Sequence, residues 1–358
     1  MFFHLIISLP MLVCLFWCIY FLIECIKDKD SSRPNSNLIL FFLAATLLYF
    51  DHWLFFSGQV YTAGEWSYGV ANLCVYPLYY AYLLRLTQVR RPWEVSALLL
   101  PALLAVFLFP IGRYTEWMTD KSTFLVVRFC FSIQVVWVLI RGYRLLGQTI
   151  RRLDNTYSDD RSRLLRPTHV SLVLFGVTAV VSMVLNLMGR DYFAQDAPVA
   201  FPAVIMSVLL YGLGFVAAQT VMPPESIVNQ TDDEGSTITD EQNSNVLIHD
   251  IDRVMREKML YTNAGLTIHD LADAVHSNRT YVSNCINRSY GINFSQYIAR
   301  QRVAYAQLIL RDARYNTDKA AIADAIVLSG FSSDQTFYRV FKEQTGTTPL
   351  QYRKANAE

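Results

Sequence analysis

Residues 267–287 read TIHDLADAVHSNRTYVSNCIN, which is the pattern of two short amphipathic helices joined by a tight turn. Apolar side chains recur at helical spacing on both sides of the polar turn His276-Ser277-Asn278. Thr267 can cap the first helix and Asn278 the second, because their side-chain oxygens accept the unpaired N–H groups of a helix start. Such a helix-turn-helix places its second helix, here Arg279–Asn287, in the major groove of DNA.

A second stretch further along the chain repeats this arrangement. Its first helix carries apolar residues on one face: Ile322, Ala325 and Ile326. Ser329-Gly330-Phe331 supplies the turn, and Gly330 can take a positive φ there. Ser332 or Ser333 caps the next helix, which is predicted from Asp334 to Glu343. A longer helix, Phe294–Arg311, is predicted to connect the two units.

Many residues of both units stand in an order and spacing that match a known family. In the second unit these are Gly330-Phe331, Phe337, Arg339, Phe341-Lys342, Gly346, Pro349 and Tyr352-Arg353. In the first unit and the connecting helix they are Leu271-Ala272, Tyr281-Val282, Gly291, Phe294, Tyr297, Arg302, Ala306 and Leu310. On these residues, the stretch from Val246 to Arg353 resembles the AraC/XylS-type DNA-binding domain. It departs from the family at Ala325 and Ile326, where isoleucine and alanine are usual, so this helix is expected to pack slightly differently.

The resemblance implies two recognition helices on one rigid connecting helix, each reading one of two successive major grooves. The outward residues expected to contact DNA are Arg279, Thr280, Ser283, Asn284 and Asn287 in the first unit, and Ser333, Asp334, Gln335, Tyr338, Arg339 and Lys342 in the second. Asparagine and glutamine pair with adenine, arginine with guanine, and aspartate accepts from cytosine. Lys342, Arg288, Arg302 and Arg353 suit phosphate contacts or a scaffold role. Each outward residue has the alternative role of a solvated surface residue, and Arg339 has that of a structural residue.

An acidic spacer precedes this domain. Residues 223–245 carry six acidic side chains and no basic ones, whereas residues 246–358 carry 14 basic and 11 acidic ones. A polar, charged segment of this kind buries too little apolar surface to fold, so residues 223–245 are expected to be a flexible linker.

The rest of the chain is strongly apolar, and 53% of all 358 residues are hydrophobic. A membrane-spanning helix needs about 20 mostly apolar residues. Seven segments meet this description: Phe2–Ile26, Leu38–Ser57, Tyr68–Gln88, Val95–Ile111, Phe124–Leu146, Val170–Gly189 and Val199–Thr220. The first is too long for the core of a cleavable signal peptide and has no basic residue ahead of it.

Basic residues between these segments predict their orientation. Thirteen lysines and arginines lie at the loops after spans 1, 3 and 5, and three lie in the alternate loops. The excess of positive charge marks cytoplasmic loops, so the N-terminus is expected outside and the C-terminus in the cytoplasm. The DNA-binding domain is thereby predicted to lie in the compartment that holds DNA.

Polar residues inside the predicted spans suggest a sensor pocket. Asp51 and His52 lie near the outer end of span 2, and Arg128 lies at similar depth in span 5. Charged residues within a membrane are costly and often functional, so an Asp51–Arg128 pair is expected to form the floor of a pocket open to the outside. A purely structural ion pair, or an arginine that extends to the interface, is the alternative.

We therefore expect an all-α chain with three parts: a seven-helix transmembrane bundle (1–222), an acidic flexible linker (223–245) and a domain with two helix-turn-helix units (246–358). Its expected location is the bacterial inner membrane. The expected function is transcription regulation coupled to a membrane or extracytoplasmic signal. The expected partners are double-stranded DNA, the lipid bilayer, RNA polymerase, a second copy of the chain in a homodimer, and a small ligand of unknown identity.

Enzymatic activity, a cofactor and a metal are not expected. The six cysteines form no Cys-x-x-Cys pair, and the chain has no glycine-rich phosphate loop and no His-Glu-x-x-His motif. Two alternatives stay open: a membrane transporter or enzyme with a DNA-binding regulatory tail, and a membrane anchor that only tethers DNA.

Overall fold

The computed structural model describes residues 2–27, 35–58, 62–114, 120–158, 165–188, 200–220, 241–312 and 317–356. These residues divide into two compact units, which are considered separately below. The N-terminal unit contains residues 1–148 and 164–229, and the C-terminal unit contains residues 149–163 and 230–358. The predicted linker largely falls in residues 221–240, which lie outside the described residues, and its last five residues belong to a helix that begins at Glu241.

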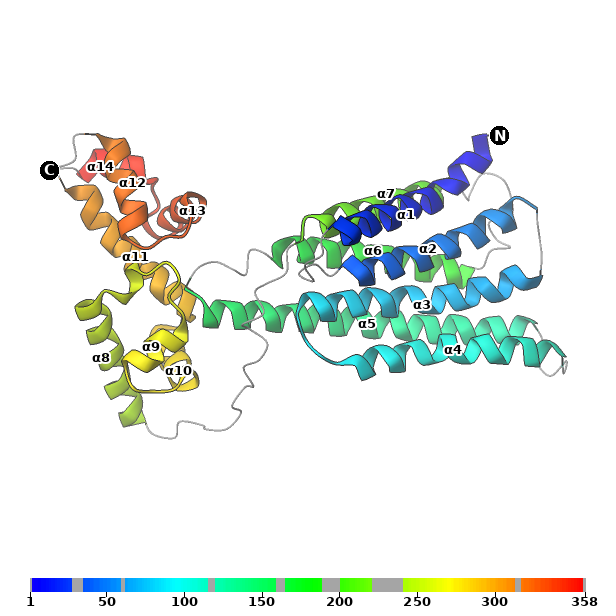
Figure 1. Cartoon of the computed structure of the whole chain (residues 1–358), viewed down its shortest axis with the longest axis horizontal. Helices are drawn as coiled ribbons and strands as arrows, with labels where there is room; N and C mark the ends of the chain where they lie inside the picture. The colour runs from blue at the N-terminus through cyan, green and yellow to red at the C-terminus, as the bar shows by residue number, and fades with distance from the viewer. Residues whose placement is uncertain are drawn as a thin grey trace. The chain divides into compact units, whose positions relative to one another are not determined.

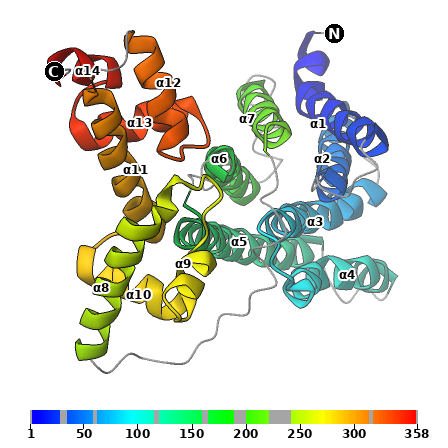
Figure 2. The ribbon, with the colours of Figure 1, turned by 60° about the vertical axis from the view of Figure 1, so that its left-hand side comes forward.

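All seven predicted spans are helical in the N-terminal unit (Figure 1). The helices are α1 (Phe2–Lys27), α2 (Asn35–Phe56), α3 (Thr62–Leu86), α4 (Pro92–Tyr114), α5 (Asp120–Thr156), α6 (Arg166–Met188) and α7 (Ala200–Ala218). Helix α2 lies between α1 and α3, α4 follows beside α3, and α7 lies between α1 and α6 (Figures 1 and 2).

Five of the described helices are long and apolar enough to cross a membrane, namely α1, α2, α5, α6 and α7. The prediction of seven spans is therefore supported only in part. Helix α3 carries Asn72 and a run of tyrosines that lower its hydropathy, and three of them, Tyr79, Tyr80 and Tyr82, are buried. The apolar part of α4, Pro92–Phe107, is shorter than the length of a usual span.

An aromatic core joins α2, α3, α5 and α6. The rings of Tyr79 on α3 and Phe175 on α6 are stacked, with centroids 3.6 Å apart. Phe41 of α2 packs against both rings, and Phe131 of α5 meets Tyr76 of α3 edge-on at 5.1 Å. Large aromatic rings bury much apolar area each, so this cluster ties helices that are distant in sequence into one bundle.

The C-terminal unit is built from short helices around one long helix. Its elements are α8 (Glu241–Lys258), the 3₁₀ turn η4 (Leu260–Thr262), α9 (Ile268–Ala274), α10 (Arg279–Tyr290), α11 (Phe294–Arg311), α12 (Asp318–Leu328), α13 (Asp334–Thr345) and α14 (Pro349–Asn356). Helices α8, α9 and α10 surround one end of α11, and α12, α13 and α14 surround its other end (Figures 1 and 2).

Helix α11 contributes to two separate hydrophobic cores. Its first half places Phe294, Tyr297 and Ile298 in a core shared with α8, α9 and α10. Its second half places Val303, Ala306, Ile309 and Leu310 in a core shared with α12 and α13. Each helix-turn-helix unit therefore has its own core, and the predicted connecting helix, with its bounds as predicted, joins them.

Candidate nucleic-acid interface

The first helix-turn-helix is fixed by side-chain caps at both helix starts. Thr267 Oγ1 accepts from the Asp270 amide at 3.3 Å, and the Asp270 carboxylate accepts from the Thr267 amide at 2.8 Å. Asn278 Oδ1 accepts from the Tyr281 amide at 2.8 Å and starts α10. Both predicted caps are thus confirmed, and they set the direction in which α10 leaves the turn.

Helix α10 turns its polar face away from the core. Val282, Cys285 and Ile286 are fully buried, so the residues between them face outward. Asn284 and Asn287 are exposed, while Arg279, Thr280 and Ser283 are partly exposed. The helix runs on to Tyr290, beyond the predicted end at Asn287, and stops at Gly291 with φ +68°. All five predicted contact residues therefore share an accessible polar helix with amides, hydroxyls and a guanidinium, and DNA contact itself remains a prediction.

The second unit repeats this geometry. Ser333 Oγ accepts from the Thr336 amide at 3.3 Å and caps α13, while Phe337, Val340 and Phe341 are buried. The predicted contact residues on the opposite side are exposed: Ser333, Asp334, Gln335, Tyr338 and Lys342. Ala325 and Ile326 of α12, where the sequence departs from the family, are both buried in this unit.

Arg339 differs from the other predicted contact residues because it is engaged with an acid on its own helix. Its Nη1 donates to both carboxylate oxygens of Glu343, at 2.9 and 2.7 Å. The Arg339 side chain is 26% exposed. The ion pair engages Nη1 alone, so a base or phosphate that is to be bound by this nitrogen has to compete with the Glu343 carboxylate.

Two arginines that were predicted as phosphate or scaffold residues lie in the scaffold. Arg302 is 2% exposed and donates from Nε to the Tyr261 carbonyl and from Nη2 to the Asn263 carbonyl, both at 2.8 Å. Arg353 is 4% exposed and donates to the carbonyls of Leu310 and Asp312 at the end of α11. Both guanidinium groups are buried and donate to backbone carbonyls, which is a scaffold role.

Asp252 joins α8 to the first unit through two tyrosines. Tyr290 donates to Asp252 Oδ2 at 2.5 Å, and Tyr297 donates to Oδ1 at 2.7 Å. Burial, followed by the nearby Asp252 carboxylate, raises the pKa of Tyr290 to about 12 and that of Tyr297 further above its usual range. Both phenols therefore stay protonated and act as donors at physiological pH.

The C-terminal end of α5 belongs to the C-terminal unit, which sequence reasoning missed. Ser158 donates from its amide to the Leu266 carbonyl at 3.1 Å, and Tyr157 forms an antiparallel bridge with Thr267. Arg302 also donates to Ser158, from Nη1 to the carbonyl at 3.2 Å and from Nη2 to Oγ at 2.9 Å. The loop that leads into α9 is thus bonded to residues more than one hundred positions earlier in the chain.

The predicted sensor residues lie on two helices of the N-terminal unit. Asp51 is buried on α2, and the ring of His52 meets that of Tyr68 edge-on at 4.9 Å. Arg128 is partly exposed on α5. The pairing of Asp51 with Arg128 and the pocket around them remain predictions. Within the described ranges, no group of three histidine, cysteine or acidic residues is placed to hold a metal ion.

Comparison with known proteins identifies the C-terminal part. Residues 271–355 match the family model described as "Helix-turn-helix domain". The chain is 34% identical over 93 residues to the melibiose operon regulatory protein of Escherichia coli, which is 26% of this chain and 29% of that protein. It is 33% identical over 88 residues to the uncharacterized HTH-type transcriptional regulator YisR of Bacillus subtilis, covering 25% of this chain and 29% of the relative.

A solved structure also has limited similarity to part of the chain. The C-terminal domain of the response regulator yesN from Fusobacterium nucleatum is 22% identical, with a TM-score of 0.25, and the match covers 31% of this chain and 98% of that one. The chain thus spans less than a third of the length of the curated relatives, and the match lies in its C-terminal part. On the family model, the relatives and the motif residues together, the C-terminal part of this chain is an AraC-type helix-turn-helix domain.

Proposed function

We propose that this chain is a membrane-embedded transcription regulator that binds specific DNA sequences and couples a signal at the membrane to transcription. The observation that carries the proposal is the pair α10 and α13, each capped at its start, each with a buried apolar face and an exposed polar face, and both supported by α11. Two such helices suit two successive major grooves. The melibiose operon regulatory protein, a relative of this domain, is by its name a regulator of an operon.

The apolar helices of the N-terminal unit support the membrane part of the proposal. Helices α1, α2, α6 and α7 present many large apolar side chains on the surface of the unit, among them Phe16 (53% exposed), Leu47 (53%), Val173 (65%) and Phe201 (76%). Exposed apolar surface of this extent is unfavourable in water and favourable in hydrocarbon. The distribution of basic residues favours a cytoplasmic C-terminus, where the DNA-binding domain reaches DNA.

Helix α5 supplies a route by which the membrane part can act on the DNA-binding domain. It is one continuous helix, Asp120–Thr156, whose residues up to Gln148 belong to the N-terminal unit and whose last turns belong to the C-terminal unit. Ser158, which follows it, is bonded to the loop before α9 and to Arg302 of the connecting helix. A change in the position of α5 would therefore act on the scaffold that carries α10 and α13.

The proposed regulator also needs a signal that it detects and partners on which it acts. A ligand bound near Asp51, His52 and Arg128, and association of two copies of the chain, are the simplest inputs, because two half-sites bound together raise the effective concentration of the second domain. RNA polymerase is the proposed output partner, as for transcription regulators in general.

The proposal is tested by crosslinking the full-length protein to DNA in intact cells and sequencing the bound fragments. The wild type is compared with a variant in which Arg279, Asn284, Gln335 and Tyr338 are alanine. The control variant, Gln344→Ala, changes an exposed residue of α13 nine positions after Gln335. We expect discrete sites for the wild type and the control, and none for the quadruple variant. Background binding by all three proteins would overturn the proposal.

A further inference from the structure

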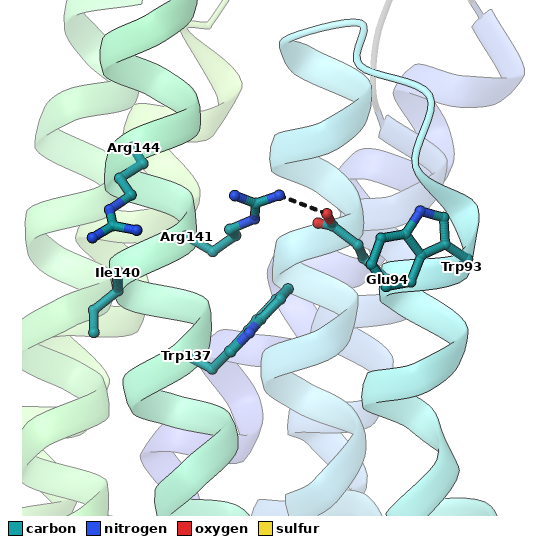
Figure 3. Close-up of a pocket in the computed structure, with 6 residues that line it drawn as sticks. All are labelled: Trp93, Glu94, Trp137, Ile140, Arg141 and Arg144. Atoms are coloured by element: carbon teal, nitrogen blue, oxygen red, sulfur yellow. Dashed lines mark hydrogen bonds and ion pairs between the residues drawn. The ribbon is translucent and has the colours of Figure 1, made fainter.

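A pocket between α4 and α5 carries chemistry that the proposed function does not use. Its volume is about 370 Å³, and it is lined by Trp93, Glu94, Trp137, Ile140, Arg141 and Arg144 (Figure 3). Trp137, Arg141 and Arg144 follow one another at i, i+4 and i+7, so they share one face of α5. Arg141 and Trp137 extend toward Glu94 of α4 in Figure 3.

Glu94 organises the wall of this pocket. Its side chain is fully buried and accepts from Arg141 Nη2 at 2.8 Å, from Arg91 Nη1 at 3.2 Å and from the hydroxyl of Tyr80. The ring of Tyr80 in turn meets that of Trp137 edge-on at 5.2 Å. One carboxylate is thus shared by two arginines, and positive charge remains in excess at the pocket.

Arg144 adds a further positive charge. It is exposed, and no described residue forms an ion pair with it. Arg141 is also 35% exposed beyond its bond to Glu94. Arginine holds phosphate oxygens through parallel N–H donors, so two guanidinium groups on adjacent turns of one helix suit a phosphate group.

Two apolar stripes lead away from the pocket along the surface of the unit. On α4, the stripe begins with Trp93 (67% exposed) and continues through Leu100, Leu103 and Phe107. On α5, it begins with Ile140 and runs back through Val136, Ile133 and Phe129. A water-soluble phosphate would use the arginines alone, whereas a molecule with a phosphate head and apolar tails would use the arginines and both stripes.

We propose that this pocket binds an anionic glycerophospholipid, with its phosphate on Arg141 and Arg144, its headgroup against Trp93 and Trp137, and its acyl chains along the stripes of α4 and α5. Arg91, in the loop before α4, donates to Glu94 at the pocket, and basic pockets between helices on the cytoplasmic side of a membrane bind anionic headgroups. The inference rests on the proposed membrane location of the N-terminal unit and is independent of DNA binding. The proposed lipid contacts α5, the helix whose last turns belong to the C-terminal unit.

The test uses the full-length protein in neutral detergent and follows tryptophan fluorescence, because two of the six tryptophans line the pocket. Brominated phosphatidylglycerol and brominated phosphatidylcholine are added as quenchers. We expect saturable quenching by the anionic lipid at a concentration at which the zwitterionic lipid has little effect. Arg144→Gln should weaken binding of the anionic lipid about tenfold. Arg151→Gln, which removes the same charge from an exposed site on the same helix, should change it less than about twofold.

Controls separate the possible outcomes. Arg144→Lys keeps the charge but loses the planar pair of donors, so its affinity for the anionic lipid should lie between those of the wild type and of Arg144→Gln. If Arg144→Gln does not fold, Arg144→Lys takes its place in the comparison. Equal quenching by the two lipids would overturn the proposal. An equal loss of affinity for the anionic lipid in the variants of Arg144 and Arg151 would overturn it too. Full displacement of the lipid by millimolar inorganic phosphate would identify a soluble anion site instead, and would also overturn it. Membrane fractionation of the same variants tests the membrane location separately.

Discussion

Arg302 of α11 donates two hydrogen bonds to Ser158, one to the backbone carbonyl at 3.2 Å and one to Oγ at 2.9 Å. The same guanidinium holds the carbonyls of Tyr261 and Asn263. One side chain therefore fastens the end of α5 and the entry to α9 onto the helix that connects the two DNA-binding units.

Ser158→Ala should loosen this junction without unfolding the domain. The substitution removes one hydrogen bond to a charged donor, which contributes about 1.5–3 kcal/mol. The backbone amide at position 158 donates to the Leu266 carbonyl. In hydrogen-exchange mass spectrometry of the full-length protein, we expect this amide to exchange its hydrogen at least tenfold faster in the variant than in the wild type. Arg302→Leu should have a larger effect, because it removes the hydrogen bonds to the carbonyls of Tyr261, Asn263 and Ser158 together. Unchanged exchange in both variants would show that the junction is not formed in solution.

Gly330→Ala should destabilise the second unit strongly. Gly330 has φ +80°, and an added Cβ would lie 2.5 Å from the Thr262 carbonyl oxygen and 2.6 Å from that of Tyr261. The left-handed conformation costs about 1–2 kcal/mol and overpacking against rigid backbone about 1–3 kcal/mol more. Gly346→Ala is the matched control, because its φ is +77° but nothing lies within 4 Å of its added Cβ. Urea unfolding measures the free energy of unfolding of each variant. An equal decrease in the two variants would contradict the proposed steric role of Gly330.

Alkaline pH should open the contact between α8 and the first unit. The pKa of Tyr290 is raised to about 12, first by burial and then by Asp252, above its unfolded value of about 10. The folded state thus keeps a proton that the unfolded state loses, so the stabilisation is complete below pH about 10 and is lost as pH rises toward about 12. Asp252→Asn should lower the pKa of Tyr290, which is measured as the difference between the tyrosinate absorbance of each protein and that of its Tyr290→Phe counterpart across the pH range. No change in that titration would exclude Asp252 as a cause.

Gln335→Ala should reduce sequence discrimination, whereas Gln344→Ala should leave it unchanged. Both glutamines are exposed on α13, but nine residues at 100° per residue place them on opposite sides of the helix. A good bidentate contact to a base contributes about 1–3 kcal/mol of discrimination, which is roughly 5- to 150-fold. Binding to wild-type and single-base-changed operator fragments measures it. Equal effects of the two changes would place the DNA-reading surface elsewhere.

Local signals in the sequence predicted much of the C-terminal unit. The caps Thr267, Asn278 and Ser333 and the bounds of α11 could be predicted, because capping depends on a few neighbouring residues and apolar spacing marks the buried face. The ends of α10 and α13 were predicted too early, since no buried apolar residue marks their last turns.

Contacts between distant residues could not be predicted in the same way. Arg302 was expected to contact phosphates or support the scaffold, and only its burial against Tyr261, Asn263 and Ser158 decides for the scaffold. The ion pair of Glu94 with Arg141 joins positions 47 residues apart, and nothing local in the sequence pairs them. The predicted span ended at Leu146, whereas α5 continues to Thr156, and the buried Leu153 lies in this continuation.

If the N-terminal unit is embedded in a membrane, as proposed, the bonds of Ser158 also bear on release of the C-terminal unit by proteolysis. The chain enters the C-terminal unit twice, once through residues 149–163 and again after residue 229. A protease that cut once between residues 221 and 240 would sever the peptide chain, yet Tyr157 and Ser158 would still be fastened to Leu266, Thr267 and Arg302. Escape of the severed domain would then require that junction to dissociate as well. The nicked protein should therefore sediment with membranes until the junction opens.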